Sequence, residues 1–288
     1  MAGKLKKKIT VGTICNYAII TLITFCCLYP FLNVIAYSLS GYNAVLSGRV
    51  TFYPIDFTLD AYKQILGRSQ IWMSMKSTVI VTVLGTFLSL FLTVCAAYAL
   101  SRDYLPGRKF FTGLILFTMY FSGGMIPTFL VVKQLGLYDT LAALFIPQSV
   151  NVFNFIVMRT FFRELPKELE EAARIDGASD IQTLARIILP LSLPIIATIG
   201  LFYAVGYWNS YFAPLIFLSN EKLQPIQLYL RSILITSEVQ ASGMGLDAIL
   251  MNEQMKYAVI VIACFPIMVL YPFIQKYFEK GVLIGAVK

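Results

Sequence analysis

Carboxylates are concentrated in one short segment of this otherwise apolar chain. Six of the fifteen acidic residues lie between Glu164 and Asp180, in or directly before the segment LPKELEEAARIDGASD. Histidine is absent, which removes imidazole metal sites and Ser-His-Asp or Cys-His catalysis from consideration. We therefore expect no catalytic residue and no metal site, and the purpose of the acids must be sought in the local fold of the segment.

The acidic segment carries the signals of a helix, a break and a second helix. Pro166 suits the first turn of a helix, where its missing N–H costs nothing. The three glutamates in Glu168–Glu171 then place negative charge at the positive end of the helix dipole. Gly177 ends the helix, because glycine readily takes a positive φ there. Ser179 and Gln182 form a capping box that starts the next helix.

The first of these helices presents a narrow stripe of small and apolar side chains bordered by acids. Leu169, Ala172, Ala173 and Asp176 recur at helical spacing, and Ile175 follows near the end. A helix lying on the inner leaflet would carry Lys and Arg instead, because anionic headgroups repel carboxylates. The stripe therefore predicts a rigid helix that is approached closely by a protein partner.

The rest of the chain has the composition of a membrane protein. Of its 288 residues 58% are hydrophobic and 13% are charged, and the mean hydropathy is +0.74. Six apolar segments reach the roughly 20 residues that a spanning helix needs. They are approximately 12–39, 73–100, 110–132, 141–162, 189–218 and 256–278. The first follows KLKKK, and its length, with no clear cleavage site after it, favours an uncleaved span over a signal peptide.

The distribution of Lys and Arg predicts the orientation in the membrane. With the N-terminus in the cytoplasm, fifteen basic residues lie inside and eight outside. Six spans then place both termini in the cytoplasm, together with the loop 163–188 that contains the acidic segment. The two longer outer segments, 41–72 and 219–255, are too small for cores of their own, so they should pack on the membrane part or on a partner.

A longer stretch, EAARIDGASDIQTLARIILP, resembles the cytoplasmic signature, or EAA motif, of the permease subunits of ATP-binding-cassette (ABC) importers. All seven specified positions match: Glu171, Ala172, Ala173, Gly177, Ile187, Leu189 and Pro190. The resemblance implies that this loop forms the coupling helix, which docks in a groove of the ATPase subunit. The residues that it assigns to coupling are Leu169, Glu171, Ala172, Ala173, Ile175, Asp176 and Gly177.

Two further stretches are similar to the carbohydrate-type permeases of this family. They are WNSYFAPLIF, from Trp208 to Phe217, and QKYFEKGVLIGAVK, from Gln275 to Lys288, which lacks the final Gly common in the group. Permeases for pectin- or alginate-derived oligosaccharides are the most similar group. The resemblance implies an all-α membrane protein with the type I ABC importer permease fold, in which residues 1–288 form a single transmembrane domain of six helices.

The chain lacks an energy source of its own for import against a gradient. It has no G-x-x-x-x-G-K-[ST] loop to hold ATP phosphates. Its spans also lack the buried acids of a proton relay. The acids near the spans, Asp56, Asp60, Asp103, Asp139 and Glu279, lie in loops or at span ends. Both absences indicate an external ATPase, so ATP and Mg²⁺ are expected on a partner chain and no cofactor on this one.

The resemblance also implies partners and location. We expect a transport subunit rather than an enzyme, in the bacterial cytoplasmic membrane, paired with a second homologous six-span permease. Two ATPase subunits, an extracellular solute-binding protein and an oligosaccharide substrate complete the assembly, and no nucleic acid is expected. ATP-driven closure would reach the permease through Glu171–Gly177 and produce alternating access. One alternative is a permease for another small solute. A self-contained secondary transporter is a second, but it would leave the acidic helix unexplained. A membrane enzyme is a third, but no catalytic constellation is visible.

A path for sugars should carry neutral hydrogen-bonding and aromatic side chains inside the spans. The candidates are Tyr120, Asn151, Asn154, Tyr207, Trp208, Asn209 and Tyr211. Alternatively, such residues join helices to one another, as polar residues in membranes often do. Gly123, Gly124 and Pro127 indicate a kink or irregular turn in the third span rather than a substrate contact.

Overall fold

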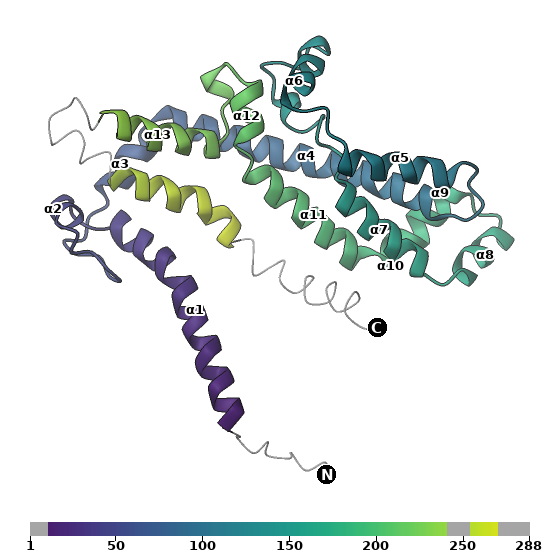
Figure 1. The fold of residues 1–288 in the computed structure, drawn as a ribbon, viewed down its shortest axis with the longest axis horizontal. Coiled ribbons are helices and arrows are strands. Elements are labelled where there is room, and N and C mark those ends of the chain that lie inside the picture. The colour runs from purple at the N-terminus through teal and green to yellow at the C-terminus, as the bar shows by residue number, and fades with distance from the viewer. Residues whose placement is uncertain (1–10, 241–253, 270–288) are drawn as a thin grey trace. The chain divides into compact units, whose positions relative to one another are not determined.

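The computed structural model describes residues 11–240 and 254–269, and every regular element within these ranges is helical (Figure 1). The elements before the acidic segment are α1 (Val11–Ser38), α2 (Tyr42–Leu46), α3 (Asp60–Leu66), α4 (Ser69–Ser101), α5 (Arg108–Tyr120), α6 (Met125–Gln134), η1 (Leu141–Leu144) and α7 (Val152–Glu164). Those that follow are α8 (Glu168–Ile175), α9 (Asp180–Thr183), the π-helical turn η2 (Leu184–Ile188), α10 (Leu189–Leu191), α11 (Leu193–Trp208), α12 (Phe212–Phe217), η3 (Glu221–Leu223) and α13 (Ile226–Gln240). A last described helix covers Gln254–Val269. The all-α prediction is confirmed for this part of the chain.

The chain divides into two compact units, and the first combines Met1–Arg68 with Ser232–Cys264. In this unit every described side chain of α1 from residue 12 to residue 32 is exposed. A long apolar helix in this state needs lipid or another protein around it. The end of α1 packs with the loop after it, where Ala36, Ala44 and Val50 form a small buried cluster.

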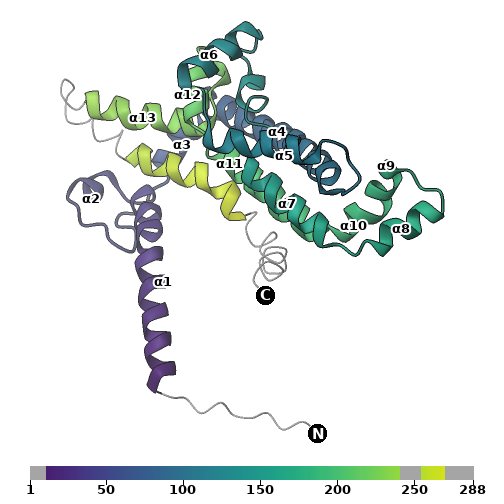
Figure 2. The ribbon, with the colours of Figure 1, turned by 45° about the vertical axis from the view of Figure 1, so that its right-hand side comes forward.

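The second unit, built around Ser69–Arg231, contains the acidic segment and the main core. Its central helix α4 packs along α11 and α7, and the three lie side by side in both ribbon views (Figures 1 and 2). Small and hydroxylated residues on α4 allow this close approach. The Ser89 and Tyr207 hydroxyls lie 2.8 Å apart, and a Cβ on Gly85 would come within 2.9 Å of the Tyr207 ring. Such small and polar contacts are typical of helix packing in membranes.

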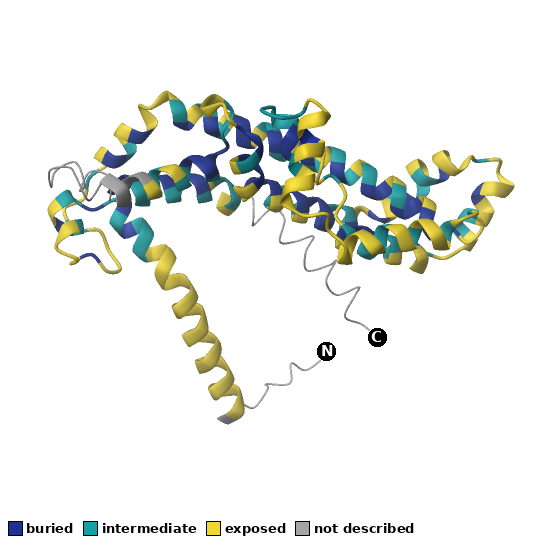
Figure 3. Ribbon diagram, turned by 45° about the horizontal axis from the view of Figure 1, so that its top comes forward, coloured by how far each residue is buried: buried dark blue, intermediate teal, exposed yellow. Residues whose placement is uncertain are grey.

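The outer surface of this unit also exposes large apolar side chains. Phe155, Met158 and Phe162 of α7 are almost fully buried, whereas Phe87 on the opposite face of α4 is 73% exposed. Figure 3 shows how exposed residues alternate with buried ones along the helices of the unit. Exposed aromatic side chains on a long apolar helix indicate contact with lipid or with a partner chain.

The predicted spans are supported to different degrees. Two helices, Gly12–Ser38 and Ser69–Ser101, are long and apolar enough to cross a membrane. Two helix pairs qualify only as broken spans: α5 with α6, bent by 119°, and Asp180–Leu191 with α11, bent by 84°. The break predicted in the third span is confirmed, since α5 ends at Tyr120 and Gly124 has a φ of 91° before α6. The number of six spans and the position of both termini stay predictions.

The predicted fourth and fifth spans differ from continuous helices. Residues 141–162 begin with the short turn η1, and residues 145–151 are not helical before α7 starts. Pro147 lies within this interruption, and Asn151 starts the new helix by accepting a hydrogen bond from the Asn154 N–H at 3.0 Å. Span 189–218 is divided by turns at Ser192 and again at 209–211. Of span 256–278, only the part up to Val269 lies within the described residues, and the tail Gln275–Lys288 lies outside them.

Candidate functional site

The acidic segment forms two short helices that are fixed by their caps. Gly177 has a φ of +78°, its N–H donates to the Arg174 carbonyl at 3.0 Å, and the Ala178 N–H donates to the Ala173 carbonyl at 2.9 Å. These two bonds define a Schellman motif at the end of α8. Ser179 then begins α9 with a complete capping box to Gln182. The predicted helix, break and second helix are confirmed.

The two faces of α8 differ in their surroundings. On the inner face Ala173 is 5% exposed and the Glu170 side chain is 14% exposed. The outer face carries the exposed residues Glu171 and Ala172, and Ile175 there is 86% exposed. The predicted single stripe is therefore wrong in one respect: Ala172 and Ala173, being neighbours in a helix, lie on different sides. Only Ala172 of the two is open to a partner.

Arg102, directly after α4, forms the most buried charged contact of the site. It is ion-paired with Glu170, and its side chain is 10% exposed. The guanidinium also lies 4.5 Å from the centroid of the Tyr98 ring and donates to the Phe162 carbonyl at 3.5 Å. Arg102 thus contacts α4, α7 and α8 at once. An arginine is suited to this position, because its planar group can bond to a carboxylate and stack on a ring together.

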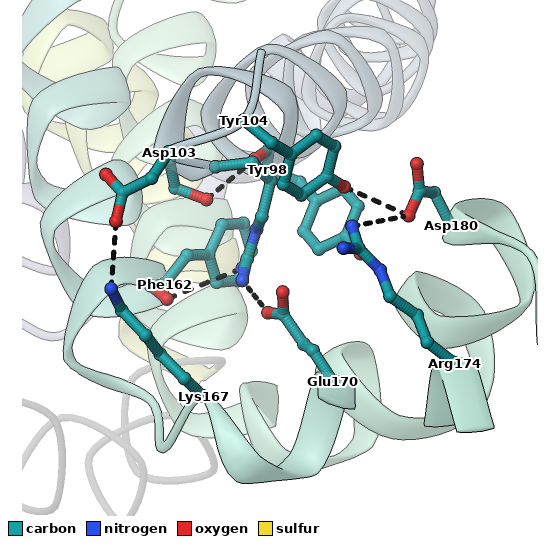
Figure 4. A network of polar contacts seen from close by, with 10 residues as sticks. Tyr98, Asp103, Tyr104, Phe162, Lys167, Glu170, Arg174 and Asp180 are labelled. Atoms are coloured by element: carbon teal, nitrogen blue, oxygen red, sulfur yellow. Dashed lines mark hydrogen bonds and ion pairs between the residues drawn. The ribbon is translucent and has the colours of Figure 1, made fainter. Parts of the chain in front are cut away.

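Asp103 forms a second connection between the α4–α5 loop and the start of α8 (Figure 4). Its carboxylate accepts a hydrogen bond from the Lys167 ammonium at 2.9 Å and a further bond from the Arg108 guanidinium. The two cations lower the pKa of Asp103 to about 2, with the hydrogen bond from Lys167 as the largest cause. Asp103 therefore stays ionised at any physiological pH.

Tyr104 forms a third connection, to the start of α9. Its hydroxyl donates to Asp180 at 2.9 Å, and Asp180 also accepts from Arg174 at 3.4 Å. The Arg174 guanidinium lies 4.2 Å from the centroid of the Tyr104 ring. Partial burial, and then the bond to Asp180, raise the pKa of the Tyr104 hydroxyl, which keeps it protonated as a donor. A cavity of about 190 Å³ lies among the side chains of this network.

We call these contacts the clamp: Arg102 to Glu170, Asp103 to Lys167, and Tyr104 to Asp180 (Figure 4). Sequence reasoning missed it, since it used the basic residues after the second span only to orient the chain. The available signal was complementary charge, because Arg-Asp-Tyr follows one span and a Lys, Glu and Asp occur in the acidic segment. Sequence alone does not show which of these charges meet.

The structure separates the proposed path residues into groups. Asn151, Asn154 and Tyr207 line a pocket of about 160 Å³ together with Tyr203 and Ser210. Several of these polar atoms also join helices. The Asn151 N–H donates to the Tyr203 hydroxyl at 3.0 Å, and the Tyr207 hydroxyl contacts Ser89.

The remaining path candidates do not line that pocket. Trp208 is 7% exposed, and Tyr120 on α5 is 86% exposed. Asn209 accepts a hydrogen bond from Gln227 at 3.4 Å, and the Tyr211 ring lies beside Arg231. Within residues 11–240 and 254–269, no group of three or more Cys, Asp or Glu side chains is arranged to hold a metal ion.

Comparison with known proteins gives consistent findings. Residues 71–284 match the family model described as "Binding-protein-dependent transport system inner membrane component". The Bacillus subtilis (strain 168) polygalacturonan/rhamnogalacturonan transport system permease protein YtcP is 46% identical over 94% of this chain and 96% of its own length. Protein LplC of the same organism is 45% identical over 96% of this chain and 94% of its own length.

A solved structure shows the fold. One chain of a bacterial ABC transporter involved in the import of the acidic polysaccharide alginate superposes with a TM-score of 0.86. It is 35% identical, and the match covers 96% of this chain and 100% of that chain.

Proposed function

The chain belongs to the family of binding-protein-dependent transport system inner membrane components, and on this basis we propose that it couples ATP hydrolysis on a separate subunit to oligosaccharide import. The family and its similar relatives make it the permease component of a carbohydrate ABC importer in the bacterial cell membrane. The finer steps of docking, coupling and alternating access are the content of the proposal.

The outer face of α8 is the observation that carries the docking step. Ile175 is 86% exposed and Ile181, just after the break, is 79% exposed. Large aliphatic side chains so exposed outside the spans indicate a contact surface for protein. The acids Glu168 and Glu171 beside them are also exposed, so the surface suits a groove with basic and apolar side chains. We infer that this groove belongs to the ATPase subunit.

The clamp supports the transmission step. A displacement of α8 would reach α4 through Arg102, since Glu170 and the Tyr98 ring hold the same guanidinium. It would reach α11 through α9 and the turns that follow it, because these elements are continuous in sequence. Through rigid connections of this kind, closure of an external ATPase would move the helices as rigid bodies. The movement would open the path alternately to the two sides of the membrane.

Further partners and the substrate follow from the same proposal. The family description names a binding protein, so we propose a solute-binding protein outside and a second permease of the same kind in the membrane. ATP and Mg²⁺ would be held by the partner ATPase. One relative is named for polygalacturonan and rhamnogalacturonan, and the solved structure for alginate, so we propose an oligosaccharide of such a polysaccharide as the substrate.

A size change at Ala172 tests the docking step. Ala172→Trp adds a large ring to the outer face of α8 without touching the clamp, and should reduce binding of the ATPase at least about tenfold, because one misfit in an interface core costs over 1.4 kcal/mol. The small substitution Ala172→Ser is the matched control and should bind as the wild type does. Binding would be measured on membranes that contain each variant at equal amounts.

Two results would count against this proposal. One is undiminished ATPase binding and uptake in Ala172→Trp. The other is an equal loss in Ala172→Ser, which would mean that the position acts through the fold of α8 and not through its outer face.

A further inference from the structure

Arg231 has no carboxylate partner among the residues that the structure describes. It lies on α13 and is partly buried, and its Nη1 atom is buried with no hydrogen-bond partner. No ion pair joins it to any side chain that the structure describes. A guanidinium stays charged at every physiological pH, and a partly buried charge without a partner is costly. An unpaired cation at such a position indicates a ligand that supplies the missing anion.

The groups around Arg231 are neutral hydrogen-bonding and aromatic side chains. Its guanidinium carbon lies 5.5 Å from the centroid of the Tyr211 ring, which is within the range of a cation–π contact. Gln227 lies one turn earlier on the same face of α13, and its amide donates to the Asn209 side chain at 3.4 Å. Tyr211 is 48% exposed and Asn209 is exposed, so both are open to a ligand.

These four residues lie at the end of α11 that is remote from the acidic segment. α11 starts at Leu193, soon after α9 and α10, and ends at Trp208, directly before Asn209. Its 16 residues span about 24 Å, close to the thickness of the apolar part of a membrane. With the acidic segment on the cytoplasmic side, as proposed, the cluster lies toward the outer side of the membrane, from which a solute arrives.

We propose that Arg231, Tyr211, Gln227 and Asn209 form a binding site for an acidic sugar, in which Arg231 binds the carboxylate of a uronic acid residue. The inference rests on the proposed function, because it assigns the substrate class of an oligosaccharide permease. A sugar offers hydroxyl groups for the two amides and an apolar ring face for the Tyr211 ring. A uronate adds one carboxylate, which a guanidinium binds with two parallel hydrogen bonds.

The two amides and the aromatic ring favour a sugar over a lipid. A lipid phosphate would also neutralise Arg231, but a headgroup is bound mainly through cations, so this alternative does not explain an exposed Tyr ring face beside two amides.

Lys222 offers a matched control in the same segment. It is an exposed cation on η3, and its ammonium contacts none of the described residues, so its removal takes the same charge from the surface without touching the cluster.

The experiment measures affinity for a defined pair of probes, trigalacturonate and its methyl ester, which share the sugar backbone but differ in that the ester has uncharged, methylated carboxyl groups. The full importer is purified with its partner permease and ATPase subunits but without the solute-binding protein, and the Kd is measured by equilibrium dialysis. Arg231→Gln should weaken trigalacturonate binding about tenfold or more, as expected for loss of a charge-assisted hydrogen bond, and weaken the methyl ester about twofold. Arg231→Lys should restore part of the affinity, and Lys222→Gln should change the Kd for trigalacturonate less than about twofold.

Several outcomes would overturn the inference. They are an equal loss for both probes in Arg231→Gln, an equal loss in Lys222→Gln, or an Arg231→Gln defect that occurs only in bilayers with anionic lipid, which would assign the guanidinium to a headgroup. Uptake in proteoliposomes with the solute-binding protein separates this inference from its premise. Import of neutral but not of acidic oligosaccharides overturns the inference alone, whereas import of neither overturns the proposed function as well.

Discussion

Arg102 holds the inner face of α8 through a contact in which both partners are largely removed from water. Its side chain is 10% exposed and that of Glu170 is 14% exposed. Such a pair adds little net stability, because desolvation offsets the attraction, but breaking it leaves a charge buried without a partner. The Arg102–Glu170 pair therefore determines the position of α8 more than it contributes to the free energy of unfolding.

A double-mutant cycle on this pair provides the first prediction. Arg102→Ala leaves Glu170 unpaired at a cost of about 3–5 kcal/mol, so α8 should shift and uptake per ATP hydrolysed should fall about tenfold. The double variant Arg102→Ala/Glu170→Ala should recover part of this loss, because no buried charge remains. Uptake and ATP hydrolysis are measured on one preparation.

The exposed pair of Lys63 with Asp60 serves as the control for that cycle. Its side chains are 76% and 64% exposed and its atoms are 3.6 Å apart. Lys63→Ala should therefore change uptake little, since exposed pairs contribute about 0–1 kcal/mol. A double variant no better than Arg102→Ala would contradict the predicted role of the pair.

Asp103 gives a prediction about pH. Its pKa in the folded protein is about 2, below the ordinary value of 3.8. A depressed pKa means that the contribution to stability is complete above about pH 4 and is lost as the pH falls toward 2. The difference in Tm between the wild-type complex and Asp103→Asn should thus be constant from about pH 5.5 to pH 8. A difference that changed within this range would show that another group titrates at the clamp.

At the scale of elements, the break between α8 and α9 depends on the backbone of Gly177. Its φ is +78°, and a Cβ added there would meet nothing within 4 Å. The cost of Gly177→Ala is therefore purely conformational, about 1–2 kcal/mol, and should appear as faster amide exchange of α8 and reduced uptake. Gly113→Ala is the matched control, because Gly113 lies inside α5 with an equally open Cβ position and ordinary helical geometry. Equal effects of the two substitutions would mean that the left-handed turn is unimportant.

Local chemistry made several elements predictable from the sequence. The Schellman turn at Gly177, the capping box of Ser179 and the break at Gly124 depend on residues within a few positions of one another, and all three occur. Residues 141–162 are not one continuous helix, and apolar composition alone does not indicate where a backbone stops being helical. Pro147 and the capping side chain of Asn151 decide that point.

Contacts between distant segments could not be predicted in the same way. Arg102 and Glu170 are both ordinary charges in sequence, and only the packing of α4 against α7 brings them together. The sequence also does not show which of Ala172 and Ala173 is buried, because this depends on which side of α8 faces the α4–α5 loop. In the sequence, Arg231 is one of the basic residues that indicate the outer side, and only the structure shows that its Nη1 atom is buried without a hydrogen-bond partner among the described residues.

At the scale of the whole molecule, exposed apolar surface indicates that the chain works within a larger assembly. α1 exposes Ile14, Tyr17 and Phe25 by more than half, and α4 exposes Phe87 by 73%. Lipid accounts for part of this surface, and a second permease would cover another part. The proposed docking on α8 and the proposed sugar site near Arg231 require opposite sides of the membrane, so the orientation of the chain decides whether both proposals can hold.

Site-directed cysteine labelling tests that orientation. The five native cysteines, Cys15, Cys26, Cys27, Cys95 and Cys264, are first replaced by Ser or Ala. A cysteine at the exposed position Glu168 of α8 should then react with a membrane-impermeant thiol reagent only when the cytoplasmic side is open. One at Tyr53, which is 67% exposed in the segment 41–72, should react in intact cells. The expectation rests on the excess of fifteen basic residues inside over eight outside, which sets the topology during insertion. Labelling of the Glu168→Cys variant in intact cells, with protection of the Tyr53→Cys variant, would reverse the orientation and place α8 beyond the reach of a cytoplasmic ATPase.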